Sequence, residues 1–267
     1  MSVDGGGTPV LRRVLQALRD SAAALAFAVC LVLLWHAVVA ARLVSPVFLP
    51  APARVFDELC VQIRDASLLE PLAATTWRMA LGWALASAVG IALGGLVGAS
   101  RSARTYLSPM LEFMRPLPAS AIIPVAVLFL GLSDRMSIAV IAFGSIWPVL
   151  LATVQGFAST EAQLIELASA LCMRPAAVLR KIVLPGAVPD IMAGMRVSLA
   201  IALILAVVTE MQASQIGLGQ NILLAQRSYR SAELYAGILV LGVLGFVLNQ
   251  GLALVEARLL RWRAAPG

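Results

Sequence analysis

The sequence has few of the residues that catalysis and metal binding use. It contains one histidine, three cysteines and only 13% charged residues. A single histidine cannot by itself form a metal site or an acid–base pair, and no paired carboxylates, Ser-His-Asp set or cysteine cluster occurs. The pattern G-x-x-x-x-G-K-[ST] is also missing, so this chain cannot bind ATP through a P-loop. These absences argue against a membrane-embedded enzyme, and we expect no cofactor in the chain itself.

The lone histidine and the three cysteines have simpler interpretations. His36 lies inside an apolar segment, where a single histidine is most often hydrogen-bonded between helices. On the topology given below, Cys30 falls in the membrane, Cys60 outside and Cys172 inside, so no two of them can form a disulfide. We expect all three cysteines to be packing residues.

What the sequence has in abundance is hydrophobic residues, at 61%, which places the chain in a bilayer. A helix needs about 20 apolar residues to cross the hydrocarbon layer. The first apolar run, of about 20 residues, exceeds the core of a secretory signal peptide and is therefore predicted to be a true span. The sequence predicts an all-α polytopic membrane protein with six transmembrane helices, at about 22–43, 74–99, 116–132, 136–157, 191–211 and 233–255.

The basic residues set the orientation, because positive charges resist translocation and remain in the cytoplasm. With both termini inside, the cytoplasmic side holds thirteen of the twenty basic residues: Arg12, Arg13, Arg19, Arg101, Arg104, Arg115, Arg174, Arg180, Lys181, Arg196, Arg258, Arg261 and Arg263. The seven on the outer side are balanced by seven acids, so the formal net charge of +6 lies inside. This asymmetry accounts for the basic composition, and we expect no nucleic-acid partner.

Two amphipathic segments flank the spans. Residues 1–21 are predicted to form a cytoplasmic tail followed by a helix in the inner interface, because "VLRRVLQALRD" places its apolar and basic residues on opposite faces. The segment "ARVFDELCVQIRD" repeats the pattern outside. We expect both helices to shield the bundle, and residues 22–267 to form the transmembrane domain.

The second span carries five small residues spaced by four. Such a row removes side chains from one ridge of the helix and lets a neighbouring membrane helix approach closely. The row comprises Gly82, Ala86, Gly90, Gly94 and Gly98. We expect it to be a helix-packing surface, although the sequence does not say which helix lies across it.

The third span is interrupted by Pro116, Pro118 and Pro124, which free backbone carbonyl groups that lipid cannot satisfy. Interrupted membrane helices are tolerated where protein or water covers the break, and they often line a transport path. The alternative is a kinked helix that only packs. Trp147 and Pro148 repeat this pattern more weakly in the fourth span.

The loop at about 158–190 is longer than a connection requires, so we expect it to have a partner. Thr160 and Gln163 fit a capping box at the start of a first short helix, which should end near Cys172. Pro175 suits the first turn of a second helix, which should end before Pro185. Both helices are too short to be stable alone in water, so packing must hold them.

In this loop the sequence "IELASALCMRPAAVLRKIVLPGAVPDIMAGMRVSLA" resembles the cytoplasmic EAA loop of ABC importer permeases. Further segments, among them "FLPAPARVF", "RPLPASAIIPVAVLFLGLSD" and "GLGQNI", are similar to the nitrate, sulfonate and taurine importer permeases in the same order. The resemblance covers nearly all of residues 45–260. It implies the type I ABC importer permease fold and a non-catalytic subunit.

The resemblance also assigns roles to residues of the loop, which in that family forms coupling helices that dock into the ATPase subunit. The implied ATPase-coupling residues are Glu166, Ala168, Cys172, Arg174, Ile182, Leu184 and Pro185. Two positions depart from the family pattern. Leu167 replaces the first alanine, and Cys172 replaces a glycine that serves where the chain turns through positive φ. A cysteine there either bears about 1–2 kcal/mol of left-handed strain or the bend is made differently.

The partners implied are two ABC ATPase subunits that bind ATP and Mg²⁺, a second permease copy, an extracytoplasmic substrate-binding protein and the bilayer of a bacterial inner membrane. The substrate implied is a small anion or organic acid. The expected pathway residues are Met114, Pro116, Pro118, Pro124, Met195, Ser198, Glu210 and Met211, the last two near the outer gate. Arg196 either attracts an anion or flanks a span. The alternative function is a self-sufficient secondary carrier or channel.

Overall fold

The computed structural model describes residues 9–114, 117–160 and 162–261, and every regular element in them is helical. This confirms the all-α fold class. The helices in chain order are α1 (Pro9–Ala40), α2 (Pro52–Arg64), α3 (Leu69–Ala99), α4 (Arg101–Met114), the 3₁₀ turn η1 (Ala119–Ile122), α5 (Ile123–Leu130), α6 (Asp134–Ala158), α7 (Ala162–Ala170), α8 (Pro175–Val178), the π turn η2 (Leu179–Val183), α9 (Leu184–Ala213), α10 (Leu218–Arg227) and α11 (Ser231–Leu259).

Four helices are long and apolar enough to cross a membrane: α3, α6, α11 and the continuous helix Pro175–Ala213, which joins α8, η2 and α9. They correspond to the second, fourth, sixth and fifth predicted spans. The first predicted span falls in α1, whose described apolar part is the shorter segment Ala26–Ala40. No break separates it from the segment expected in the interface, because α1 is one helix.

The predicted third span at 116–132 is not one straight helix. Two helical segments, Ser102–Met114 and Ala119–Leu130, are bent by 77° relative to each other and are apolar and long enough to cross only when taken together, as a broken span or a re-entrant loop. The second segment, Ala119–Leu130, begins directly after Pro118, which adopts an extended conformation at φ −71° and ψ 109°. A helix of twelve residues is only about 18 Å long, so this second segment alone is too short to cross the hydrocarbon layer. Pro116 lies outside the described residues.

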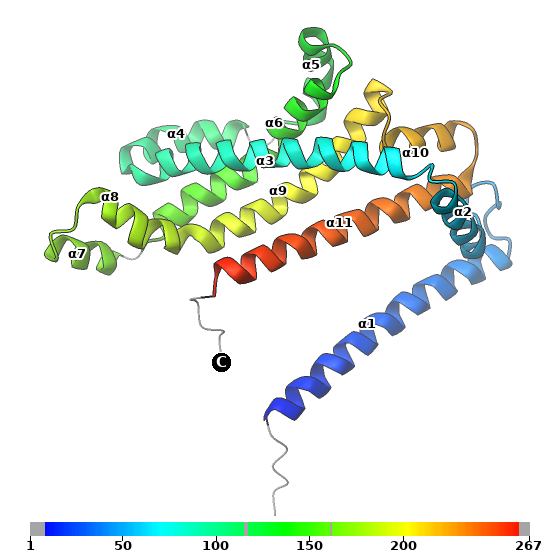
Figure 1. Ribbon diagram of the computed structural model, residues 1–267, viewed down its shortest axis with the longest axis horizontal. Coiled ribbons are helices and arrows are strands. Elements are labelled where there is room, and N and C mark those ends of the chain that lie inside the picture. The colour runs from blue at the N-terminus through cyan, green and yellow to red at the C-terminus, as the bar shows by residue number, and fades with distance from the viewer. Residues whose placement is uncertain (1–8, 115–116, 161, 262–267) are drawn as a thin grey trace, which may run out of the picture.

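The core of the molecule is formed by α3, α6 and α9, which pack along most of their lengths (Figure 1). The row of small residues on α3 faces α6. A Cβ atom added at Gly82, Gly94 or Gly98 would lie 2.5–2.7 Å from Ile141, from Thr153 or from Phe157, respectively. The partner numbers rise with the glycine numbers, so the two helices run parallel in direct backbone contact.

Small residues also bring α6 and α9 together, here antiparallel. A Cβ atom at Gly156 would lie 3.0 Å from Ala187, and one at Gly194 would lie 2.5 Å from Ala152. Further along the same two helices, the Ser198 hydroxyl donates to the Ser145 carbonyl oxygen at 2.6 Å. Close approach of backbones is how membrane helices gain van der Waals contact when lipid removes the hydrophobic drive between them.

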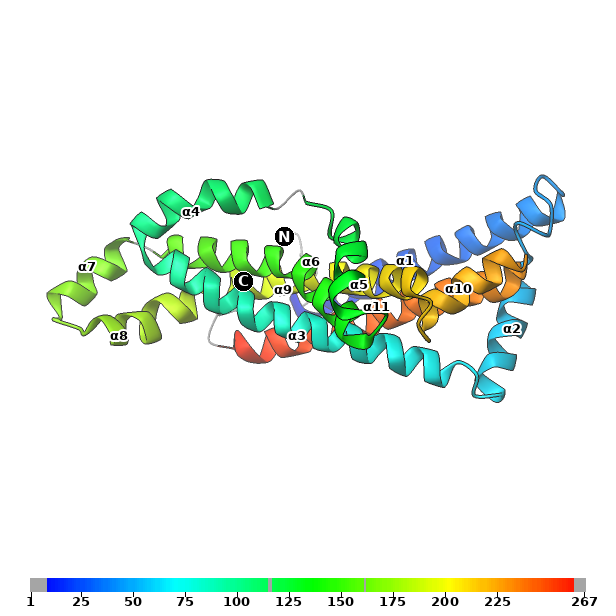
Figure 2. The same ribbon diagram turned by 90° about the horizontal axis from the view of Figure 1, so that it is seen from above.

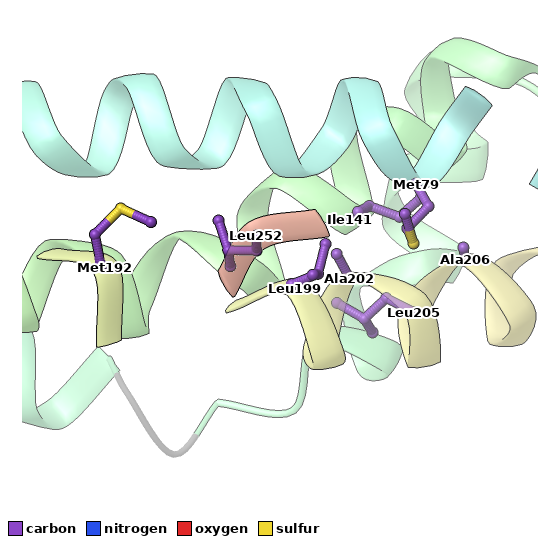
Figure 3. Close-up of a cluster of buried hydrophobic side chains, with 8 residues drawn as sticks. All are labelled: Met79, Ile141, Met192, Leu199, Ala202, Leu205, Ala206 and Leu252. Carbon is purple, nitrogen blue, oxygen red and sulfur yellow. The ribbon is translucent and has the colours of Figure 1, made fainter. Parts of the chain in front are cut away.

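The largest group of buried apolar side chains lies where the long helices meet. Figure 3 shows Met79 of α3, Ile141 of α6, several side chains of α9 and Leu252 of α11 converging on one another. These side chains, with the small residues between the helices, fix α3, α6 and α9 as one unit.

The outer helices are far less buried. Figure 1 shows α1 meeting the rest of the chain near α2 and diverging from α11 along its length. At the meeting point, the Trp35 indole N–H donates to the Pro50 carbonyl oxygen at 3.1 Å and its ring contacts Tyr235. The expectation that His36 is hydrogen-bonded between helices is wrong for this chain, because His36 is exposed on α1 and makes no hydrogen bond to the described residues.

The three cysteines are free, as expected, but all are exposed rather than packed. Cys60 lies on the apolar face of α2, of which Val55 is buried while Cys60 itself is exposed within the chain.

Candidate functional site

The loop after α6 folds into two arms, α7 and α8, which project from one end of the bundle (Figure 2). The first arm ends in a Schellman motif, in which the Met173 amide donates to the Ala168 carbonyl oxygen and the Cys172 amide to that of Ser169, both at 3.0 Å. Cys172 therefore occupies the left-handed position, at φ 51°. The turn keeps the geometry of the glycine pattern, and the cysteine bears the strain.

The expected capping box at the start of this arm is not formed. The Thr160 hydroxyl donates to the Phe157 carbonyl oxygen at 3.3 Å, so it is engaged with the end of α6. Instead, α7 begins at Ala162.

The expected end of the second helix before Pro185 is also wrong. The chain continues from α8 through the π turn into α9, and the Leu184 amide donates to the Leu179 carbonyl oxygen, five residues back. A proline ring clashes with the carbonyl group four residues earlier in an ordinary α-helix. A π turn changes the register of the hydrogen bonds just before Pro185, so the helix survives the proline. The second arm is thus rigidly continuous with a core helix.

The two arms expose a large share of their apolar side chains. Leu167 is 56% exposed and Leu171 66% exposed, and further exposed apolar groups are Leu164, Ile165, Leu179 and Leu184. Ala168 is buried, Ile182 and Pro185 are half-buried, and Glu166, Cys172 and Arg174 are exposed. The charge asymmetry of the sequence predicts that this end lies in the cytoplasm, where lipid would not cover these leucines.

The loop is tied to the core at its base. The Ser159 hydroxyl donates to the Gly156 carbonyl oxygen at 3.0 Å and approaches Asp190 of α9 at 3.5 Å. Gly156 packs directly on Ala187, as described above. These contacts join the base of the loop to both α6 and α9.

A second feature is an apolar groove of about 660 Å³ between the bent third crossing, α6 and α9. We call it the groove. Its lining residues include Leu117, Ser120, Trp147, Pro148 and Val197. It lies beside the helix break, where irregular backbone must be covered by protein or face a water-filled space.

Of the expected pathway residues that the structure describes, none lines the groove, although several lie near it in the sequence. Met195 is packed against the core cluster, and its carbonyl oxygen accepts from the Trp83 indole at 3.1 Å. Ser198 is buried against α6, whereas Pro118 and Pro124 are exposed outside the lining. Met114 and Met211 are half-buried, and Pro116 lies outside the described residues. Trp147 and Pro148, which the sequence indicated only as a weaker interruption of the fourth span, do line the groove.

Arg196 forms an ion pair with Glu256 of α11, and about half of its side chain is exposed. Its charge is thus partly neutralised within the chain, and it lines an apolar depression between α9 and α11 rather than the groove.

The third feature is a set of buried polar groups at the opposite end, near α10. Glu210 of α9 is fully buried, and its carboxylate accepts three hydrogen bonds: from Arg78 at 3.1 Å, from Thr75 at 3.0 Å and from the Gly219 amide at 3.0 Å. Arg78 also donates to Asp134 at 2.7 Å and to the Ile216 carbonyl oxygen at 2.6 Å. We call these residues the outer cluster.

The outer cluster joins α3, α6, α9 and the start of α10. The first amides of α10 lack intrahelical partners, and here the Leu218 amide donates to Thr75 and the Gly219 amide to Glu210. The positive end of the α10 dipole thus faces the buried carboxylate. Gly217 is required for this approach, because a Cβ atom there would lie 2.2 Å from the Glu210 carboxyl carbon.

A signal for the outer cluster exists in the sequence. Arg78 and Glu210 are opposite charges near the outer ends of two spans, and a charge within a span needs a partner. Their pairing could therefore be inferred, whereas Glu210 was expected to line the pathway.

Comparison with known proteins places the chain in a family. Residues 86–261 match the model of the family described as binding-protein-dependent transport system inner membrane component. A putative aliphatic sulfonates transport permease of Bacillus subtilis is 31% identical over 87% of this chain and 84% of its own length. A taurine transport system permease of Escherichia coli is 32% identical over 87% of this chain and 86% of its own length.

A solved structure has the same fold. The chain is similar to one from the MetNI methionine ABC transporter in inward-facing conformations, with a TM-score of 0.62 and 17% identity over 72% of this chain and 95% of that one. At this identity the likeness concerns the fold alone.

Proposed function

Since this chain belongs to the family of binding-protein-dependent transport system inner membrane components, we propose that it lines the translocation path of an ABC importer and couples that path to separate ATPase subunits. The chain is non-catalytic in this proposal. ATP and Mg²⁺ bind to the partner ATPases, which close on ATP binding and move the loop at 158–190. Two permease chains then rock between inward-facing and outward-facing states.

The observation that carries the proposal is the exposed apolar surface of the loop at its predicted cytoplasmic end, formed by Leu164, Ile165 and Leu167 of α7 with Leu171, Leu179 and Leu184. Exposed leucines outside the bilayer that gather on a projecting element indicate a protein contact. The helix continues from α8 into α9, and Gly156 of α6 packs directly against Ala187 of α9. In this proposal, a force applied at the exposed surface is therefore passed to the core helices. Glu166 and Arg174 supply charged groups at the rim of the same surface.

The test replaces Leu167 by Asp in the chain expressed together with its ATPase. We expect the ATPase to be lost on co-purification, because a carboxylate in a buried contact must be desolvated without a partner. Ser102→Asp is the matched control, since Ser102 is an exposed residue at the start of α4 and is not part of the loop. Retention of the ATPase and of transport by Leu167→Asp would refute the docking role.

The substrate in this proposal is a small anion or organic acid, of the sulfonate, taurine or nitrate kind. Supporting it are the two relatives named as sulfonate and taurine permeases. The groove, bordered by the broken third crossing, is the path element contributed by this chain. An extracytoplasmic binding protein delivers the substrate at the α2 and α10 end.

The assembly proposed is two copies of this chain with two ATPases in a bacterial inner membrane. The alternative, a secondary carrier, is distinguished by reconstituting the purified chain alone in liposomes. Accumulation of solute without an ATPase would favour the carrier, whereas the proposal expects uptake only with ATPase, ATP and binding protein together.

A further inference from the structure

Trp147 carries a hydrogen-bond donor that is not satisfied within the described part of the chain. Its Nε1 atom is buried and has no partner there. The indole groups of Trp35 and Trp83, by contrast, donate to carbonyl oxygens at 3.1 Å. A buried tryptophan N–H usually finds a partner, and leaving one unsatisfied is unfavourable. The exception at Trp147 therefore needs an explanation.

The position of Trp147 supplies one, since its side chain lines the groove. The ring of Phe143 meets it edge-on, with centroids 5.7 Å apart, which restrains the indole from one side. Around it the groove wall is formed by apolar side chains such as Leu151, Val197 and Ile204, and Ser120 adds a hydroxyl group. The volume of about 660 Å³ lies within the range of small-molecule sites.

The unsatisfied donor limits what can occupy the groove. A lipid acyl chain, or an apolar face of a second copy, offers no acceptor and would leave the N–H unpaired. An occupant with an oxyanion group and a short apolar part satisfies both the donor and the wall. No carboxylate occurs among the described residues that line the groove, so an ammonium group would find no counter-charge there.

We propose that the Trp147 indole N–H donates a hydrogen bond to a sulfonate oxygen of the transported solute, while the apolar wall of the groove holds its aliphatic part. This rests on the proposed function, and it makes Trp147 a specificity residue of the path that prefers an alkanesulfonate over its zwitterionic amino derivative. Because Nε1 has no accessible surface in this conformation, the solute reaches it when the indole turns.

The experiment uses the assembled importer in proteoliposomes, with ethanesulfonate and taurine as probes that differ by one ammonium group. Trp147→Phe removes the N–H and keeps an aromatic ring. We expect ethanesulfonate uptake to fall about tenfold, as for loss of a hydrogen bond to a charged group, with the ATPase still bound. Trp83→Phe is the control, because it removes an N–H that is paired inside the core; it should leave uptake per folded complex unchanged.

If Trp147→Phe fails to assemble, benzothienylalanine at position 147 keeps the bicyclic ring and replaces only the N–H. Uptake equal to wild type in either variant, an equal loss with Trp83→Phe, or faster uptake of taurine than of ethanesulfonate by the wild type would overturn the assignment. Failure of the proposed function looks different, since the wild-type complex itself would then show no ATP-dependent uptake of either probe.

Discussion

At the end of the bundle that carries α10, a fully buried carboxylate has both oxygens hydrogen-bonded, whereas at the end that carries α7 and α8 leucine side chains stand exposed outside the bilayer. The charged side chains of the outer cluster are hydrogen-bonded to one another and to other groups of this chain, including the backbone of residues 216–219. The loop at 158–190 leaves several of its leucine side chains exposed.

The difference indicates where the chain is complete and where it requires another molecule. A buried ionic group is tolerated only when its partners are fixed, so the outer ends of α3, α6 and α9 form one rigid unit. An exposed apolar surface is tolerated when a partner covers it. Substitutions at the outer end should therefore reduce the stability of the isolated chain, and substitutions in the loop should act mainly on assembly.

The largest effect is expected from Arg78→Leu. It leaves Glu210 buried without its cation, and breaking a buried ion pair from one side costs about 3–5 kcal/mol. The free energy of unfolding should fall by that order in an SDS titration of the purified chain in mixed micelles. Arg64→Leu is the control, because Arg64 is exposed at the end of α2 and is in none of the ion pairs formed by the described residues. Equal stability of the two variants would show that the outer cluster is not a rigid unit.

Gly217→Ala is expected to have the next largest effect. The added methyl group would lie 2.2 Å from the Glu210 carboxyl carbon, so the loop or the carboxylate must move, at a cost of about 1–3 kcal/mol. Gly186→Ala is the matched control at the opposite end, where no atom lies within 4 Å of the added group. That change should be neutral or slightly stabilising, because alanine is the better helix former. The same titration compares the two, and a neutral Gly217→Ala contradicts the close approach.

How far these features could be predicted depends on whether they are local or long-range. The spans and the projecting loop follow from apolar runs and prolines, which act over a few residues. The row from Gly82 to Gly98 predicted close packing, but the identity of α6 as the neighbour depends on topology. The hydrogen bond between Thr75 and Glu210 joins residues 135 positions apart, which no local pattern specifies.

Errors arose where two local rules competed. Pro185 was expected to end a helix, and a π turn instead accommodates it, because α9 is held by packing along α6. The third span was predicted to begin at residue 116, because the prolines there were expected to mark its start. In the structure, Pro118 instead lies at the bend between the helical segments Ser102–Met114 and Ala119–Leu130. Trp147 became notable only when its neighbours showed that its N–H was unsatisfied.

The adjacent glycines Gly94 and Gly95 test the packing of α3 on α6, the two helices that run between the ends of the bundle. A methyl group at Gly94 would lie 2.7 Å from the Leu150 carbonyl oxygen of α6, and one at Gly95 would meet only the tip of the Phe157 ring at 3.3 Å. A backbone atom cannot move aside as a ring can, so Gly94→Ala should cost about 1–2 kcal/mol and Gly95→Ala less. Denaturant titrations of both variants measure this. Reversal of the order would contradict the parallel packing of α3 on α6.

The smallest effect is expected from Cys172→Gly, which should stabilise the loop. The left-handed conformation at φ 51° costs a residue with a Cβ atom about 1–2 kcal/mol, and glycine removes that cost while losing part of the gain through its more flexible unfolded chain. The amides at 172 and 173, which donate to Ser169 and Ala168, should exchange with solvent several-fold more slowly. Cys172→Ala removes the thiol but keeps the Cβ atom, so it should not slow exchange. If alanine and glycine protect the turn equally, the strain lies elsewhere. If glycine alone does, then the cysteine makes this loop easier to deform at the surface where an ATPase is proposed to bind.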